Sequence, residues 1–344
     1  MKKYSLKNDY SEGAHPKILD AMIRTNLEQQ DGYGEDDYSK KASEIIKEKL
    51  NNKEAEIHFV SGGTQANLLV LSSLLESYQS IIAADSGHIS VHETGAIENT
   101  GHKINTVKTK DGKLTVEMIA SVLAEHTDEH MVDPKVVFIS NSTEVGSIYM
   151  KKELQELSHY CKEKGLLLYL DGARLGSALT SKKNDLTLAD ISELVDAFYI
   201  GGTKNGALIG EAIVLNKKEL QVKFRYRMKQ KGALLAKGRL IGIQFLELFK
   251  DDLYFEISEH ANKMAEKLSG AIKKGGFEFM VEPVSNQIFP ILPNELIEKL
   301  HEKYDFYIWE KIDDKNSAIR IITSWATKNI VTEVFIEELE KYVK

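Results

Sequence analysis

Cysteine and long apolar runs are scarce in this chain. A single cysteine, Cys161, excludes a framework of intrachain disulfides. Its helical register with Leu154 and Leu157 favours packing in the core. No apolar run approaches the roughly 18 residues that span a bilayer. No apolar stretch follows the basic start, MKKYSLKNDYSEG, so we expect no secretory signal and a cytoplasmic location.

An excess of positive charge is also lacking. The 45 lysines and arginines are outnumbered by 52 aspartates and glutamates, which gives a formal net charge of −7. A negative field repels nucleic acids and anionic membranes, so we expect neither as the main partner. Apolar residues make up 42% of the chain and charged residues 28%, an ordinary globular balance. The length of 344 residues is enough for about two domains.

Short apolar segments alternate with amphipathic ones in the N-terminal part of the chain. The segments that are typical of buried strands are 55–60, 80–84, 102–107, 135–140, 166–170 and 196–200. Helical patterns begin at about residue 64 and lie near 115–125 and 151–164. Continuous apolar strands between helices indicate an α/β fold, with a mainly parallel sheet covered on both faces.

The C-terminal part has a different pattern. A long helical pattern runs from about 234 to 274. Beyond it lie expected strands at 277–280, 286–292, 305–309 and 318–323, and helices near 294–303 and from about 331. This pattern predicts a smaller α+β domain. We therefore expect an N-terminal segment packing near the small domain (1–30), a large domain (31–245) and a small C-terminal domain (246–344).

One lysine occupies an unusual place. The stretch FYIGGTKNGALIG puts Lys204 in a glycine-rich turn directly after an apolar segment. Lysine is rarely buried, so the turn is either an ordinary surface turn or a place where the amine is desolvated. A desolvated lysine loses its proton and becomes a nucleophile toward carbonyls. The motif alone leaves both interpretations open.

Other polar residues follow the expected strands, at the edge where ligands of open α/β sheets bind. YLDGARLG places Asp171 directly after a strand, where a carboxylate either caps a helix or holds a cation. FVSGGTQAN places Gly63 and Thr64 between a strand and a helix, an arrangement that suits a phosphate. Neither a P-loop nor a dinucleotide fingerprint is present. His88 lies just beyond the segment 80–84.

Together these residues indicate a cofactor. Pyridoxal phosphate requires a phosphate cradle, a stacking ring, a carboxylate for its pyridinium nitrogen and a lysine that binds its aldehyde. The carboxylate keeps the ring nitrogen protonated, so the ring can accept electrons from a bond that breaks at the substrate Cα. The chain supplies these parts in that order, all at strand ends. The sequence therefore predicts pyridoxal phosphate bound covalently to Lys204.

The motifs as a set resemble those of the low-specificity L-threonine aldolases, which are fold-type-I, aspartate-aminotransferase-like pyridoxal phosphate enzymes. The shared segments are LKND, GYGEDD (32–37), SGGTQAN (61–67), GHISVHETGAIE (87–98), YLDGARLG (169–176), GGTKNGALIGE (201–211) and IRIITSWAT (319–327). The resemblance implies that fold, and cleavage of L-threonine, L-allo-threonine and related β-hydroxy amino acids to glycine and an aldehyde. It also implies a homotetramer, a dimer of dimers with sites shared between subunits.

The resemblance also implies roles for matched residues. Lys204 would bind the cofactor covalently, and His88 would stack on its ring and handle the substrate hydroxyl proton. The residues that would bind the cofactor are Lys204, Asp171, His88, Gly63, Thr64, Thr203, Arg174 and, from a neighbouring subunit, Lys229. The residues that would bind the substrate are Asn8, Tyr33, Arg174 and Arg320.

The general base stays open at this point. Many members of this family carry a histidine after the strand that corresponds to 135–140, where SNSTEVGS places Glu144. Glu144 could take the same proton role. Glu93 in HETG is a further candidate, because its counterpart in the family lies near the cofactor.

Several of these residues have structural alternatives. Arg174 could form an ion pair in the core, Arg320 could have a surface partner at a sheet edge, and Tyr33 could pack a turn. The order H-x-x-x-H-E from His88 differs from the zinc motif H-E-x-x-H, so we expect no metal. The functional alternatives are transamination or β-elimination with the same cofactor, a non-catalytic sensor, and a cofactor-free aldolase.

Overall fold

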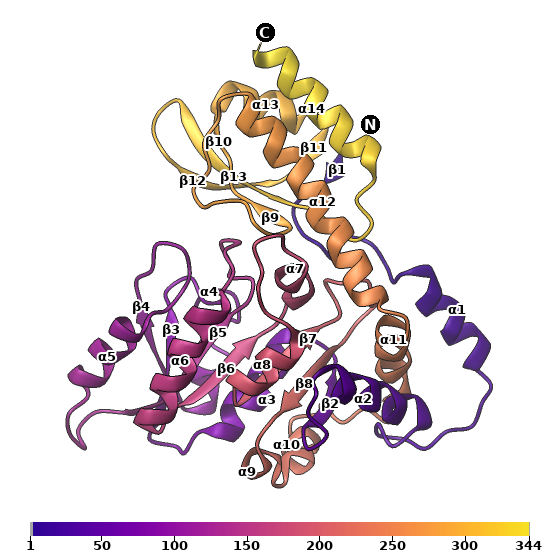
Figure 1. Ribbon diagram of the computed structural model, residues 1–344, viewed down its shortest axis with the longest axis vertical. Coiled ribbons are helices and arrows are strands. Elements are labelled where there is room, and N and C mark those ends of the chain that lie inside the picture. The colour runs from indigo at the N-terminus through magenta and orange to yellow at the C-terminus, as the bar shows by residue number, and fades with distance from the viewer. Residues whose placement is uncertain (1–2, 344) are drawn as a thin grey trace.

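The computed structural model, which describes residues 3–343, has a large lobe built around a seven-stranded sheet and a smaller lobe beside it (Figure 1). The strands of the large sheet are β2 (Glu56–Val60), β3 (Gln79–Ala84), β4 (Lys103–Val107), β5 (Asp133–Ser140), β6 (Leu167–Asp171), β7 (Ala197–Gly201) and β8 (Glu211–Leu215). Their order is β2-β8-β7-β6-β5-β3-β4. The strands from β7 to β4 are parallel, and β8 runs antiparallel to both of its neighbours.

The six strands expected in this region are confirmed, and β8 was not predicted. The strand β8 follows β7 after a turn with no helix between them, so the alternation of strands and helices does not reveal it. Because an antiparallel neighbour needs no crossover helix, the chain can return directly. That return brings Glu211, the first residue of β8, opposite Gly201 at the end of β7.

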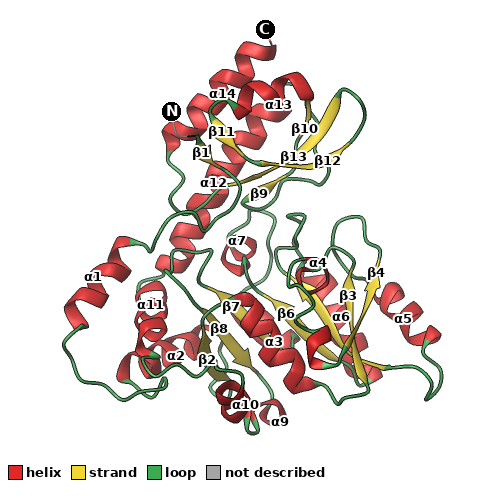
Figure 2. Ribbon diagram, turned by 180° about the vertical axis from the view of Figure 1, so that it is seen from behind, coloured by secondary structure: helices red, strands yellow, loops and turns green. Residues whose placement is uncertain are grey.

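Side chains of the sheet alternate between two hydrophobic cores. In β6, Leu168 and Leu170 belong to one core and Tyr169 to the other. The first core is covered by α1 (Pro16–Thr25), α2 (Asp37–Lys49), α5 (Val116–Glu125), α6 (Lys151–Lys164), α8 (Leu188–Leu194) and α11 (Arg239–Phe249). The second is covered by α3 (Gly63–Leu74) and α10 (Phe224–Gln230), and Figure 2 shows α3 lying across this face. Cys161 is buried in α6, as expected.

Short helices complete the large lobe. They are α4 (His88–Val91), α7 (Leu175–Leu179), α9 (Lys218–Gln221) and a 3-10 turn at Glu98–Thr100. The helices α4 and α7 begin soon after β3 and β6, at the carboxyl edge of the parallel strands. They therefore bring their first residues to the edge where the sequence predicts a ligand.

The small lobe has its own sheet and core. It contains β9 (Gln287–Ile288), β10 (Ile291–Pro293), β12 (Tyr307–Lys311) and β13 (Asn316–Ile322), with β13 central and antiparallel to the other three. The helices α13 (Asn294–His301) and α14 (Asn329–Val343) cover it. The strand β1 (Tyr4–Ser5) pairs with β11 (Tyr304–Asp305), so the N-terminal segment joins this lobe (Figure 1).

Two expectations for the C-terminal part are wrong. The helical pattern 234–274 forms two helices, α11 and α12 (Leu253–Lys274), because Asp252 adopts a left-handed conformation with φ of 57°. Residues 277–280 form no strand, only an isolated bridge between Phe279 and Pro290. The turn lets α11 pack against α2 while α12 runs on into the small lobe (Figure 1).

Within residues 3–343, the structure has no helix that is both long and apolar enough to cross a membrane.

Candidate active site

Residues that follow four parallel strands meet at one edge of the large sheet, where they face the small lobe. They line a cavity of about 440 Å³. The large lobe contributes His88, His92, Glu144, Arg174 and Lys204. The small lobe contributes Gln287, Tyr307, Ile308, Trp309 and Arg320. Tyr10, from the N-terminal segment, completes the wall, so three parts of the chain build the cavity.

Lys204 lies in the turn between β7 and β8 and faces this cavity. The turn is fixed by hydrogen bonds from the Gly202 amide to Glu211 Oε2 (2.8 Å) and from the Thr203 amide to the Gly210 carbonyl (3.0 Å). Burial, together with the nearby charge of Arg174, lowers the pKa of Lys204. The turn is therefore not an ordinary surface turn, and its amine loses a proton more readily than that of an exposed lysine.

Asp171, the last residue of β6, is buried and accepts hydrogen bonds through both of its oxygens. Its Oδ1 accepts from the Tyr199 hydroxyl (2.5 Å) and the Ala173 amide (3.0 Å), and its Oδ2 accepts from Asn67 Nδ2 (3.0 Å). It caps no helix, since α7 begins after Arg174. No lysine or arginine of the described residues forms an ion pair with it. A buried carboxylate of this kind suits a cation supplied by a ligand, such as a pyridinium nitrogen.

Asn67 links Asp171 to the histidine of the site. Its Nδ2 also donates to Glu93 Oε1 (2.8 Å), and the same oxygen lies 2.8 Å from His88 Nδ1. Glu93 therefore contacts His88 at Nδ1. The other ring nitrogen, Nε2, has no protein partner within residues 3–343. The SGGTQAN segment alone did not indicate a role for Asn67. Its position one helical turn after Gly63 and Thr64 was the available signal.

Glu144 follows β5 and reaches the same cavity. Its Oε1 accepts hydrogen bonds from the His88 backbone amide (3.0 Å) and the Ser140 hydroxyl (2.8 Å). Burial and the negative charge of Asp171 raise the pKa of Glu144. The carboxyl group can therefore hold a proton at a higher pH than an exposed glutamate does.

The N-terminus of α3 offers an anion site next to Asp171. Gly62 precedes the helix and provides no side-chain cap, so the first backbone N–H groups of α3 remain available. A Cβ on Gly63 would lie 2.9 Å from the Tyr199 hydroxyl, which is itself bonded to Asp171. The glycine thus allows the helix start to approach the buried carboxylate. Together with Lys204, these groups fit pyridoxal phosphate.

Two of the predicted carboxylate-binding residues also line the cavity. Arg174 forms a bidentate pair with Asp9, with Nε–Oδ2 and Nη2–Oδ1 distances of 2.7 and 3.0 Å. Arg320, on β13, lies 5.4 Å from the Tyr307 ring centre and 5.1 Å from that of Trp309. Arg174 therefore has the core partner considered from the sequence and still reaches the cavity. Arg320 faces the cavity rather than a surface acid.

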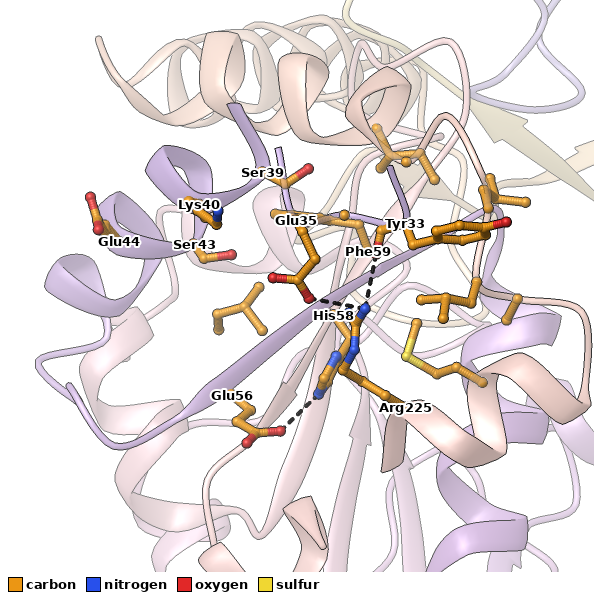
Figure 3. A pocket seen from close by; sticks show the side chains of 18 of the residues that line it. Tyr33, Glu35, Ser39, Lys40, Ser43, Glu44, Glu56, His58, Phe59 and Arg225 are labelled. Carbon is orange, nitrogen blue, oxygen red and sulfur yellow. Dashed lines mark hydrogen bonds and ion pairs between the residues drawn. The ribbon is translucent and has the colours of Figure 1, made fainter. Parts of the chain in front are cut away.

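The other proposed ligands lie elsewhere in this chain. Asn8 Oδ1 accepts from the Tyr10 amide and the Ser11 hydroxyl, at 3.1 and 2.9 Å, and Asn8 does not line the cavity. Tyr33 lines a second cavity, of about 350 Å³, between α2, β2 and α10 (Figure 3). Lys229 Nζ lies 4.5 Å from the centre of the Tyr33 ring. Arg225 also reaches this second cavity and pairs with Glu35 at 2.9 Å (Figure 3).

Several cavity residues were missed by sequence reasoning. His92 faces the cavity with its ring centre 5.4 Å from that of His88, and burial with the charge of His88 lowers its pKa. Residues 3–343 hold no cluster of three or more histidine, cysteine or carboxylate side chains that could bind a metal. Tyr307 and Trp309 lie in the expected strand 305–309, but only the fold shows that they flank Arg320.

Comparison with known proteins places this geometry in a family. The sequence model of the family described as beta-eliminating lyase matches residues 6–292. A low-specificity L-threonine aldolase of Pseudomonas sp. (strain NCIMB 10558) is 34% identical over 327 residues, which cover 93% of this chain and 92% of the relative. One of Pseudomonas aeruginosa is 32% identical over 324 residues, with the same coverage.

Solved structures agree with these relatives. A threonine aldolase of Leishmania major superimposes with a TM-score of 0.98 at 50% identity, over 99% of this chain and 100% of that one. A Thermus thermophilus aspartate aminotransferase matches with a TM-score of 0.72 at 13% identity, over 99% of this chain and 91% of that one, and shows the fold alone. The predicted fold-type-I architecture is confirmed. The chain belongs to the beta-eliminating lyase family and, within it, to the pyridoxal phosphate-dependent low-specificity L-threonine aldolases.

Proposed function

We propose that this protein cleaves L-threonine, L-allo-threonine and related β-hydroxy amino acids between Cα and Cβ, giving glycine and an aldehyde. The observation that supports this most is the convergence of Lys204, His88 and two arginines on one cavity. The buried Asp171 is connected to His88 through Asn67 and Glu93. A chain of the threonine aldolase family with this cavity has groups for the cofactor, the carboxylate and the proton of the substrate.

We infer that pyridoxal phosphate would be held by Lys204, that Asp171 would pair with its ring nitrogen and that His88 would stack on its ring. The start of α3, with Gly63 and Thr64, would hold the phosphate. Arg174 would assist from the cavity wall, Thr203 from the turn that carries Lys204, and Lys229 from a neighbouring subunit. When bound, the cofactor accepts the electron pair released as a bond at the substrate Cα breaks.

The substrate carboxylate determines which bond is oriented for cleavage. Arg320 and Arg174 approach the cavity from different lobes, and together they can hold the carboxylate by charge-assisted hydrogen bonds. With the carboxylate fixed there, the Cβ and its hydroxyl face His88 and Glu144. Orientation of this kind favours cleavage between Cα and Cβ over removal of the Cα proton. The predicted contributions of Asn8 and Tyr33 remain part of the proposal, and we infer that a neighbouring subunit supplies Tyr33.

The hydroxyl proton must be removed as the aldehyde leaves. His88 Nδ1 lies 2.8 Å from Glu93 Oε1, so this carboxylate orients the ring and leaves Nε2 to contact the substrate hydroxyl. Glu144 lines the cavity with one oxygen occupied by His88 and Ser140, and its raised pKa makes it a stronger base than an exposed carboxylate. We infer that Glu144 takes the proton, that His88 orients the hydroxyl, and that Glu93 positions His88.

The products test this function. We expect the purified, cofactor-loaded protein to release acetaldehyde and glycine from L-threonine or L-allo-threonine with no added oxo acid. Acetaldehyde can be measured with alcohol dehydrogenase, beside an assay for 2-oxo acids. 2-Oxobutyrate or pyridoxamine phosphate as the main product would indicate elimination or transamination instead. Cofactor binding without turnover of either isomer would indicate a sensor.

We also infer that the protein assembles as a dimer of dimers. The side chains of Leu19, Ile23 and Leu27 follow one another every four residues along and just beyond α1, and are 42%, 75% and 92% exposed. A cavity of about 760 Å³ between this region and α11 is lined in part by Met22 and Ile243. Exposed apolar surface of this kind is typical of a subunit interface. A neighbouring copy would also bring its second cavity, with Tyr33 and Lys229, toward the site.

A further inference from the structure

The N-terminal segment ahead of α1 contacts both arginines of the active site. The carboxylate of Asp9 forms the bidentate pair with Arg174, and the Lys7 carbonyl accepts a hydrogen bond from Arg320 Nη2 (3.3 Å). Asn286, in the small lobe, donates to Asp9 Oδ2 at 2.9 Å. Asp9 therefore joins the N-terminal segment, the large lobe and the small lobe at the cavity.

The pair between Asp9 and Arg174 is more than a surface contact. The side chain of Asp9 is 1% exposed and that of Arg174 is 12% exposed. Removing two charges from water is costly, so buried ion pairs often stabilise a fold no better than apolar residues would. Because fold stability alone does not explain this buried pair beside Lys204, the pair indicates a role of Asp9 in the active site.

The geometry of the pair leaves one edge of the guanidinium free. Asp9 occupies Nε and Nη2, and within residues 3–343 Nη1 has no hydrogen-bond acceptor, although Arg174 lines the cavity. Two parallel hydrogen bonds fix the plane of the guanidinium as well as its position. The remaining nitrogen can then meet a substrate carboxylate in a defined direction.

We propose that Asp9 is a positioning residue, which fixes the Arg174 guanidinium so that Nη1 is presented to the substrate carboxylate. This inference rests on the proposed function, in which Arg174 binds that carboxylate. Asn286 supports the arrangement by holding the same Asp9 oxygen that accepts from Arg174 Nε.

Charge balance supports the same role. Arg174, Arg320 and Lys204 would otherwise place three basic groups around one small anion. Burial opposes ionisation of Asp9, but the charges of Arg174 and Lys204 outweigh it and hold the pKa of Asp9 below its ordinary value. Asp9 therefore stays ionised in any neutral assay and neutralises Arg174 permanently.

The variant Asp9→Asn tests this inference in the cofactor-loaded protein. We expect KM for L-threonine and Kd for glycine, read from the cofactor absorbance, to rise about 10- to 100-fold, the loss expected for a misplaced charge-assisted hydrogen bond. We expect kcat to change far less. The matched control is Asp305→Asn, which removes the pair of Asp305 with Lys7 (2.8 Å) on the same segment without touching Arg174. It should bind glycine as the unchanged protein does.

Each outcome decides the inference. An Asp9→Asn variant with unchanged glycine affinity would overturn it, as would a loss confined to kcat or an equal loss in Asp305→Asn. If Asp9→Asn fails to fold, Asp9→Glu is the second variant. It keeps the charge but moves the carboxylate by about the length of one methylene group, which displaces the guanidinium of Arg174. Glycine binding must then weaken in this variant too. If the proposed function itself is wrong, the result differs from failure of this inference, because the unchanged protein would then bind glycine but release no acetaldehyde.

Discussion

Glu144 accepts a hydrogen bond from the backbone amide of His88, with 3.0 Å between Oε1 and the nitrogen. A second hydrogen bond, from the Ser140 hydroxyl, reaches the same oxygen. One carboxylate thus holds the first residue of α4, which carries the His88 ring, and also faces the cavity. The carboxylate of Glu144 therefore fixes the position of His88 as well as facing the cavity.

The variant Glu144→Gln separates these two roles. Its amide oxygen can still accept from His88 and Ser140, but it cannot take a proton. In the unchanged protein we expect the rate to fall as the pH drops through the raised pKa of Glu144, because the ionised form is the base. In Glu144→Gln this acid limb should disappear and kcat should fall about 100-fold or more. The measurement is the pH profile of acetaldehyde release. An unchanged rate and profile would make Glu144 a structural residue and leave His88 as the base.

The variant Lys204→Ala should bind the cofactor without a covalent link. In the unchanged protein, the lowered pKa of Lys204 makes its amine more reactive than those of exposed lysines. Borohydride reduction of that protein, followed by peptide mapping, should therefore find the pyridoxyl group on Lys204 alone. A suitable control is Lys218→Ala, which changes an exposed lysine paired with Glu54. That variant should label as the unchanged protein does. A pyridoxyl group on another lysine would contradict the assignment.

The variant Asp171→Asn should slow the reaction strongly. It removes the charge that would hold the ring nitrogen protonated, and a loss of about 2 kcal/mol corresponds to about 30-fold in rate. The matched control is Asp196→Asn, because Asp196 is equally buried but pairs with Lys217 outside the cavity. Turnover should be measured at saturating cofactor for both. Equal rates in Asp171→Asn and the unchanged protein would exclude the proposed role.

Glu211 should make the stability of the cofactor-free protein depend on pH. Burial raises the pKa of Glu211 to about 7 from its ordinary value of 4.5. Between these values the folded state keeps a proton that the unfolded state has lost, so stability falls as the pH rises, by up to about 3 kcal/mol.

The variant Glu211→Gln cannot ionise, and its amide oxygen can still accept from the Gly202 amide. Urea unfolding at about pH 5 and about pH 7.5 should therefore show a smaller loss of stability for Glu211→Gln than for the unchanged protein. The charges of Lys204 and Asp171, which also affect the pKa of Glu211, are present in both proteins, so the comparison isolates the ionisation of Glu211. An identical loss in the two proteins would show that Glu211 does not titrate in this range.

The variant Ile23→Glu should reduce the size of the assembly. It puts a charge in the middle of the exposed apolar stripe on α1, where burial against a second copy would leave it unpaired. Sedimentation should report a smaller particle than for the unchanged protein. Lys17→Glu, which adds a carboxylate to an exposed position of the same helix, is the control and should assemble normally. Equal particle sizes for the two variants would place the interface elsewhere.

The amino-acid sequence by itself determined the local structure and the kind of chemistry. Apolar segments between amphipathic helices are a local property of the chain, and they predicted six strands of the large sheet. Because parallel strands end at one edge, their order also placed His88, Asp171 and Lys204 together. The composition of that group was enough to predict pyridoxal phosphate.

Only the tertiary structure decided which distant residues support that chemistry. Asp9 and Arg174 are 165 residues apart, and Asn67 and Asp171 are 104 apart, and neither pair follows from spacing. The strand β8 was missed for a related reason, because it pairs with β2 and β7 and follows no crossover helix. The left-handed turn at Asp252 was missed because no glycine marks it. Hydrogen bonds between distant segments depend on how the lobes and the N-terminal segment pack, and local propensity carries no information about that packing.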